Sequence, residues 1–317
     1  MRRNFKIITV GFSPAWDITF RADALDWGEH KVISRMSRTP AGKALNISRA
    51  LAWAKVESVA AGLWGKSDFK QMLDSMRPLN KLVKVKMTPA DGSTRQNFTI
   101  VDMAKNRDIH LRSKSDLATR ISVKKLRSDL RAIVGKSDIC VFAGAMPDGA
   151  LLNHTVGVIK DCFDAKARIA VDTSGLALKK IVAFGNLWLI KPNVDELGEL
   201  LGKQIEDEAH TLVKAAKELL DKVEIVLVSR GAKGAVVVCR QGCWQARVIP
   251  GPKKTASTVG CGDYLLAGFL KGMKETGDIR YALETGLKLA SARVWGWWEK
   301  RTWKKAEKTI RIKIAKL

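Results

Sequence analysis

The chain has 317 residues, of which 46% are apolar, so it can bury a sizeable core and is not a disordered protein. Its 56 lysines and arginines exceed its 32 aspartates and glutamates, and the net charge of +24 favours anionic partners such as phosphorylated metabolites, nucleic acid or an anionic membrane. No stretch reaches the roughly 20 apolar residues of a membrane-spanning helix, the basic start lacks a signal-peptide pattern and the five cysteines are scattered, so we expect a cytoplasmic protein with reduced thiols.

Short apolar runs alternate with segments of helical period along most of the chain. In chain order, we predict strands at 6–12, 138–144, 168–172, 187–191, 224–229 and 235–239, and helices at 43–54, 153–163, 196–201 and 208–220. The strands show little internal alternation of apolar and polar residues, which is typical of parallel strands buried on both faces. The pattern predicts an α/β body with a mostly parallel central sheet.

Two segments, 12–36 and about 80–112, interrupt this pattern with short alternating stretches that predict half-exposed antiparallel strands. We expect them to form a small β lid beside a body made of 1–11, 37–79 and 113–317. The last segment, 300–317, is a basic tail with eight lysines and arginines against one acid, and it follows three closely spaced tryptophans. The tail could bind nucleic acid or a membrane, but we favour tryptophans that pack on the core and lysines that face solvent.

The sharpest motif is STVGCGD at 257–263, which leads directly into an amphipathic helix. Its glycines allow a ligand to approach the backbone, and the unpaired N–H groups of the first helical turn attract phosphate. Asp263 would repel a phosphate there unless it had a function, such as accepting the proton of an attacking hydroxyl. A capping aspartate at a tight turn is the alternative, and the motif alone leaves both open.

Other polar segments also allow two interpretations. In KPNVDE (191–196), Asn193 and Glu196 form either a helix-capping box or a site near nucleotide-bound Mg²⁺. Residues 229–234 (SRGAKG) form either a plain hairpin or part of a nucleotide site. Lys43 and Asn46 stand at the start of a predicted helix, and Asp17 follows the first strand, where it could bind hydroxyls.

In order and spacing, these segments resemble the ribokinase-like carbohydrate kinases of the phosphofructokinase B group, over about residues 5–295. STVGCGD is similar to the group's STVGAGD signature, and KPNxxE (191–196), SxGxxG (229–234), 172–175 and 94–97 match further segments. The resemblance implies a three-layer ribokinase-like sandwich with a β lid. Departures include Ala41 and Ala44 for two glycines, Tyr264 for a small residue, and a missing Pro-Gly pair near 109–114.

The resemblance also implies roles for individual residues. Asp263 would be the catalytic base, and Gly260, Cys261 and Gly262 would form the anion hole. Asp17, Gly42 and Asn46 would hold sugar hydroxyls, while Lys43 and Arg95 would bind the phosphate already on the sugar. The ATP site would comprise Lys191, Asn193, Glu196, Ser229, Gly231, Gly234 and Thr258, with Asn193 and Glu196 orienting Mg²⁺ through water.

The implied activity is ATP-dependent phosphorylation of a hexose phosphate, with 1-phosphofructokinase-type formation of fructose 1,6-bisphosphate favoured. Tagatose 6-phosphate and fructose 6-phosphate are alternative acceptors, and a weakly catalytic, sugar-phosphate-binding regulatory protein is an alternative of another class. The resemblance further implies a homodimer that pairs through the lid. Cys261 at a helix N-terminus could have a lowered pKa and react with oxidants, but we favour a small residue that only fills space.

Overall fold

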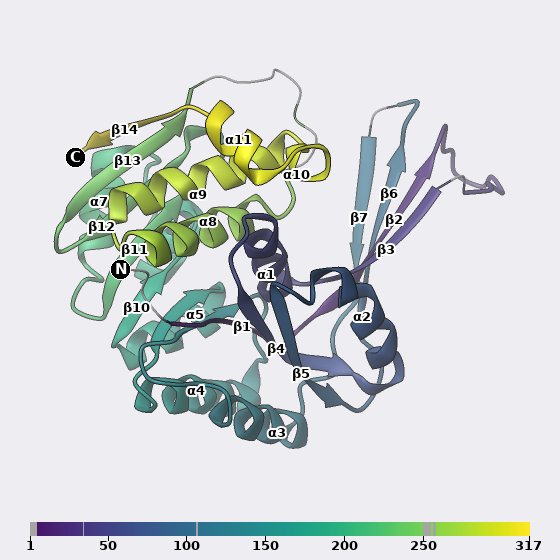
Figure 1. Ribbon diagram of the computed structural model, residues 1–317, viewed down its shortest axis with the longest axis horizontal. Helices are drawn as coiled ribbons and strands as arrows, with labels where there is room; N and C mark the ends of the chain where they lie inside the picture. Colours follow the sequence, from purple (N-terminus) through teal and green to yellow (C-terminus); the bar gives the residue numbers. More distant parts are fainter. Residues whose placement is uncertain (1–4, 34, 106, 250–254, 256–257) are drawn as a thin grey trace.

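The computed structural model describes residues 5–33, 35–105, 107–249, 255 and 258–317. A large α/β body carries a small sheet that projects from one side (Figure 1). The α/β body and the second, small β-sheet of the predicted fold class are therefore present, and we call the small sheet the lid.

The body is built on a ten-stranded sheet with the order β14-β13-β12-β11-β10-β9-β8-β1-β4-β5. Pairing is parallel from β11 through to β5, and antiparallel among β11, β12, β13 and β14. The prediction of a mostly parallel sheet is confirmed. The strands are β1 (Ile7–Gly11), β4 (Ser58–Gly65), β5 (Val83–Ala90), β8 (Ile139–Ala143), β9 (Arg168–Asp172), β10 (Leu187–Ile190), β11 (Val223–Ser229), β12 (Ala235–Cys239), β13 (Gly242–Val248) and β14 (Ile312–Lys316).

Helices cover both faces of this sheet because its strands are apolar on both sides. In β1, for example, Ile7 joins one core cluster, whereas Ile8 and Val10 join the other. The first cluster lies under α1 (Lys43–Trp53), α8 (Cys261–Glu275), α9 (Ile279–Val294), α10 (Trp297–Lys300) and α11 (Trp303–Thr309). The second lies under α3 (Arg120–Arg131), α4 (Gly149–Asp164), α5 (Gly175–Phe184), α6 (Val194–Leu201) and α7 (Ala209–Lys217), which completes the expected three layers (Figure 1).

The lid is a four-stranded sheet with the order β3-β2-β6-β7, and its boundaries differ from the predicted ones. Its strands are β2 (Ala15–Ala22), β3 (Arg35–Ala41), β6 (Gln96–Asp102) and β7 (Arg107–Arg112). The first lid segment therefore extends to Ala41. The second was predicted to begin near residue 80, which is wrong, because β5 pairs with β4 at the edge of the body sheet. Val83 and Met87 of β5 are buried in a third cluster with α2 (Phe69–Met76), which ties that strand to the body.

The basic C-terminal segment is an integral part of the body rather than a free tail. Trp303 is buried and packs edge-on against Trp53, whose Nε1 donates a hydrogen bond to the Arg301 carbonyl. Trp295, Trp297 and Trp298 lie partly buried against the same core, as the packing interpretation predicts, and β14 pairs with β13. Within the described part of the chain, every helix is too short or too polar to cross a membrane.

Candidate active site

A cavity of about 280 Å³ lies between the lid and the carboxyl ends of the body strands. This edge is where open parallel sheets bind ligands. The cavity brings together residues that are far apart in the sequence but were predicted to act together, and it adds several that were not. The predicted residues in its wall are Asp17, Gly42, Lys43, Asn46, Arg95, Lys191, Thr258, Gly260, Cys261, Gly262 and Asp263; the wall also includes Asn97, Thr99, His110, Arg112 and Asp172.

The glycine-rich turn places Asp263 in the first turn of α8. Gly260 is the N-cap residue in a left-handed conformation, with φ of 79°, which suits glycine. Gly260, Cys261 and Gly262 line the cavity at the N-terminus of α8, where the positive end of the helix dipole lies. Ser257 of the same motif lies outside the described residues. The turn thus has the features of an anion hole with a carboxylate beside it.

Asp263 is almost fully buried, and its carboxylate is held by the neighbouring helix α1. Asn46 donates a hydrogen bond from Nδ2 to Asp263 Oδ2 over 2.8 Å. Burial and, second, the nearby Asp172 raise the pKa of Asp263 to about 7, against the opposing effects of Asn46, Lys43 and Lys191. A carboxylate with such a pKa is suited to general base catalysis near neutral pH. A role as a mere helix cap does not explain the burial, because α8 has no side-chain cap at its N-terminus.

A buried carboxylate, Asp172 at the end of β9, organises the two lysines of the cavity. Lys43 Nζ lies 2.9 Å and Lys191 Nζ 3.4 Å from Asp172 Oδ1. Burial lowers the pKa of Lys43, but Asp172 outweighs this effect and the net shift is upward, so Lys43 stays charged. Sequence reasoning gave Asp172 no role. The available signal was its position at the end of a buried strand adjacent to the strand that leads to Lys191.

The lid side of the cavity is held by a polar network. Asn97 donates to Asp17 over 2.8 Å, which fixes the Asp17 carboxylate toward the cavity. Arg95 donates from Nε to the Pro14 carbonyl and from Nη1 to Asn97 Oδ1. Its remaining contacts are with the carbonyls of Ser113, from Nη1, and Ser13, from Nη2. Arg95 therefore ties β6 to the loop before β2 and to the end of β7.

The residues predicted for the nucleotide lie on the adjoining strand ends. Asn193 and Glu196 form a reciprocal capping box at the start of α6, with bonds of 2.7 and 2.8 Å, so the capping interpretation is correct. Asn193 forms an isolated bridge with Ser229. Gly234 has φ of 91°, and a Cβ atom there would lie 2.1 Å from the Ala246 carbonyl oxygen, whereas Gly231 faces open space. The close contact with β13 therefore explains why residue 234 is a glycine, without any bound ligand.

Behind the anion-hole turn lies a group of aromatic and cationic side chains. Arg293, at the end of α9, donates from Nε to the Val259 carbonyl over 3.1 Å. Its guanidinium lies 5.5 Å from the Tyr264 ring centre and 4.7 Å from that of Trp298. Burial raises the pKa of the Cys261 thiol to about 11, so the hypothesis of a reactive, low-pKa thiol is wrong.

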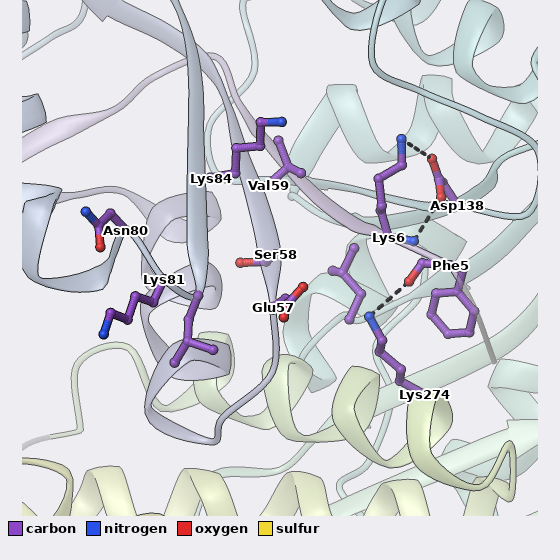
Figure 2. A pocket seen from close by; sticks show the side chains of 12 residues that line it. Phe5, Lys6, Glu57, Ser58, Val59, Asn80, Lys81, Lys84, Asp138 and Lys274 are labelled. Atoms are coloured by element: carbon purple, nitrogen blue, oxygen red, sulfur yellow. Dashed lines mark hydrogen bonds and ion pairs between the residues drawn. The ribbon is translucent and has the colours of Figure 1, made fainter. Parts of the chain in front are cut away.

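A larger cavity, of about 470 Å³, lies at the opposite edge of the sheet, where β1, β4 and β5 begin. Figure 2 shows that two of its lysines are engaged: Lys6 pairs with Asp138 at 3.1 Å, and Lys274 donates to the Phe5 carbonyl at 2.9 Å. It lies away from the helix N-terminus and from Asp263. The smaller cavity is therefore the candidate active site.

Phosphoryl transfer to a hydroxyl is the chemistry that this geometry suits, and the fold and cavity together define a kinase with a β lid. Residues 12–295 match the pfkB family of carbohydrate kinases. The chain therefore belongs to this family, and it is a phosphotransferase with an alcohol group as acceptor.

Individual relatives agree with this assignment. The chain is 26% identical to a 1-phosphofructokinase of Haemophilus influenzae over 286 residues, which are 87% of this chain and 88% of that one. It is 25% identical to a tagatose-6-phosphate kinase of Staphylococcus epidermidis over 273 residues, 84% of this chain and 85% of that one. The crystal structure of phosphofructokinase-2 from Escherichia coli in complex with fructose-6-phosphate has a TM-score of 0.86 at 24% identity, and covers 96% of this chain and 97% of that one.

Proposed function

We propose that the protein is an ATP-dependent kinase of a hexose phosphate, of the 1-phosphofructokinase type, which forms fructose 1,6-bisphosphate. The observation that carries this proposal is the buried Asp263 at the N-terminus of α8, opposite Lys43 and under a polar lid face. A hydroxyl placed beside Asp263 would give its proton to the carboxylate as it attacks the terminal phosphate of the nucleotide. The N–H groups of Gly260, Cys261 and Gly262 would stabilise the transferring phosphoryl group.

The lid side of the cavity suits a sugar. Asp17, held by Asn97, offers a carboxylate for hydroxyl groups, and Gly42 keeps the wall open beside it. The lid would exclude water from the reacting phosphate, which limits hydrolysis of the nucleotide. Tagatose 6-phosphate and fructose 6-phosphate remain the alternative acceptors, because relatives and structural neighbours carry both names.

A nucleotide would extend from this cavity along the strand ends at Lys191, Asn193, Ser229 and Gly231. Asp172 Oδ2 is buried and has no hydrogen-bond partner among the described residues, so it is an acceptor left over for a water molecule bound to a cation. Glu196, whose charge acts on Lys43, stands on the same side. We propose that Asp172, Glu196 and Asn193 hold Mg²⁺ through water, and that this ion neutralises charge on the phosphates when bound. The described residues contain no cluster of three metal-ligating side chains that would bind an ion directly.

We also propose a homodimer that pairs through the lids. Apolar side chains occupy the lid face opposite the Asp17–Asn97 row: Phe20 stacks on Phe98, and Ile109 and Leu111 are about half exposed. A second copy would cover this face and leave the cavity accessible. Sedimentation of the wild type and of Ile109→Asp tests this proposal, which predicts a dimer for the first and a monomer for the second.

The function is tested by ADP release with fructose 1-phosphate, fructose 6-phosphate, tagatose 6-phosphate and fructose as acceptors. We expect turnover with a phosphorylated hexose, the highest kcat/KM with fructose 1-phosphate, and loss of turnover on removal of Mg²⁺. ADP release that is independent of every acceptor would contradict the proposal. Binding of a sugar phosphate without turnover would instead favour the regulatory protein that the sequence left open.

A further inference from the structure

Arg112 is a cation of the cavity wall that sequence reasoning did not select. It ends β7 and lies directly across from Asn97 of β6, which in turn lies across from Asp17 of β2. Residues opposite each other in adjacent strands share one face of a sheet. Asp17, Asn97 and Arg112 therefore form a single row on the lid face that lines the cavity.

The hydrogen bonds of the other lid-side arginine limit what it can bind. Arg95 uses Nε for Pro14, and Nη1 for both Asn97 and Ser113. Nη2 donates to Ser13, so only one hydrogen of the guanidinium remains for a ligand. Two parallel hydrogen bonds to a phosphate would require Arg95 to leave the carbonyls that it holds.

Arg112, in contrast, keeps its donors. No hydrogen bond or ion pair joins its side chain to another residue in the described part of the chain, and this side chain is exposed in the cavity wall. His110, which also lies on β7 and lines the cavity, is engaged by Thr99 and Asp108. Arg112 also lies close enough to Arg95 to lower its pKa, an effect second to burial, and an anion placed at Arg112 would relieve this repulsion.

We propose that Arg112 binds the phosphate already carried by the acceptor sugar, opposite Lys43 on the body wall, while Arg95 positions the lid strands. This inference rests on the proposed function and deepens it. It assigns preference for phosphorylated over neutral sugars to the lid residue Arg112, because a guanidinium with free donors can make charge-assisted, paired hydrogen bonds to a phosphate.

The test compares Arg112→Gln and Arg112→Lys with the wild type, in complete enzyme with ATP and Mg²⁺. For the sugar phosphate that the wild type prefers, we expect Arg112→Gln to raise KM about 10- to 100-fold with kcat within about threefold, and Arg112→Lys to restore part of the loss. Any turnover of fructose should not change. Arg120→Gln is the matched control, because Arg120 is exposed at the start of α3 and lines no part of the cavity, and its KM should be that of the wild type.

Thermal unfolding separates this role from that of Arg95. Arg112→Gln should keep the melting temperature of the free protein but lose the increase caused by the sugar phosphate or by inorganic phosphate. Arg95→Gln should lower the melting temperature of the free protein, because it removes the hydrogen bonds that join β6 to the Ser13, Pro14 and Ser113 carbonyls. An unchanged KM and an unchanged phosphate-induced shift in Arg112→Gln would overturn the inference. If the wild type turned over no acceptor, the proposed function would fail, and the phosphate-induced shift would still decide the role of Arg112.

Discussion

Replacing Asp263 by asparagine should remove activity and stabilise the protein at once. The side chain is buried, and its pKa of about 7 stands well above the ordinary 3.8. The folded protein therefore retains a proton at pH 5 to 7 that the unfolded chain has lost, and the wild type loses stability as the pH rises through this range. Asparagine stays neutral and can still accept the hydrogen bond from Asn46.

The size of this effect follows from the pKa. About two pH units separate pH 5 from the folded-state pKa, and each corresponds to about 1.4 kcal/mol, so Asp263→Asn should gain about 3 kcal/mol over the wild type between pH 5 and pH 8. Turnover should fall by a factor of about 100 to 10,000, because the general base is lost. Urea unfolding of the ligand-free proteins at the two pH values and an ADP-release assay measure both effects.

Asp161→Asn is a matched control with the opposite sign. A hydrogen bond from Arg127 and, further, Arg131 lower the pKa of Asp161 to about 2, although burial opposes them. The ionised Asp161 therefore stabilises the folded protein above pH 4, and this stabilisation is lost as the pH falls toward 2. The Asp161→Asn variant should be less stable than the wild type by the same amount at pH 5 and at pH 8, and its turnover should be normal. If Asp263→Asn showed no gain between the two pH values, or retained a tenth of wild-type turnover, the assignment of Asp263 as a buried base would be refuted.

Five further variants probe the surroundings of this carboxylate, the strand ends proposed for the nucleotide, and the anion-hole turn. Lys43→Met should move the acidic limb of the kcat/KM profile above pH 7, because Lys43 lowers the pKa of Asp263. Asp172→Asn should move the same limb below pH 7, because Asp172 raises that pKa. A shift of the limb in the same direction in both variants would contradict this electrostatic explanation. Gly234→Ala should lower the stability by more than about 2 kcal/mol in urea unfolding, since its Cβ meets the Ala246 carbonyl, while Gly231→Ala should cost about 1 kcal/mol; similar costs would show that the hairpin accommodates the contact. Arg293→Met should reduce kcat about tenfold with little change in KM, because the Val259 carbonyl loses its donor behind the anion hole; a change in KM alone would assign Arg293 to substrate binding.

The layers of the body could be predicted from local patterns. Strands such as Ile139–Ala143 and Arg168–Asp172 are short, apolar throughout and followed by helical periods, and this combination has few structural solutions. The strand Val83–Ala90 was misplaced because its Lys84 and Lys86 alternate with apolar residues, which is also the pattern of a lid strand. Only its pairing with Ser58–Gly65 assigns it to the body edge, and pairing between distant segments leaves no local signal.

At the site, too, some features have a local sequence signal and others depend on distant segments of the chain. The turn at 257–263 has its glycines and Asp263 in adjacent positions, so its resemblance to the family signature predicts a base and an anion hole there. The pKa of Asp263 could not be predicted in this way. It depends on burial and on Asp172, Asn46, Lys43 and Lys191, which come from other segments of the chain. The C-terminal tryptophans pack on the body as predicted, since four tryptophans within nine residues are costly to expose.

The two lid arginines show most clearly where a motif stops being informative. Arg95 was selected because it belongs to the segment TRQN, whereas Arg112 stands in a segment that matches no motif. Arg95 donates to the carbonyls of Pro14, Ser113 and Ser13, whereas the Arg112 side chain makes no hydrogen bond in the described part of the chain, and both residues line the cavity. A guanidinium that holds the architecture and one that binds a ligand look alike in a sequence, because the distinction lies in which acceptors the fold places within reach.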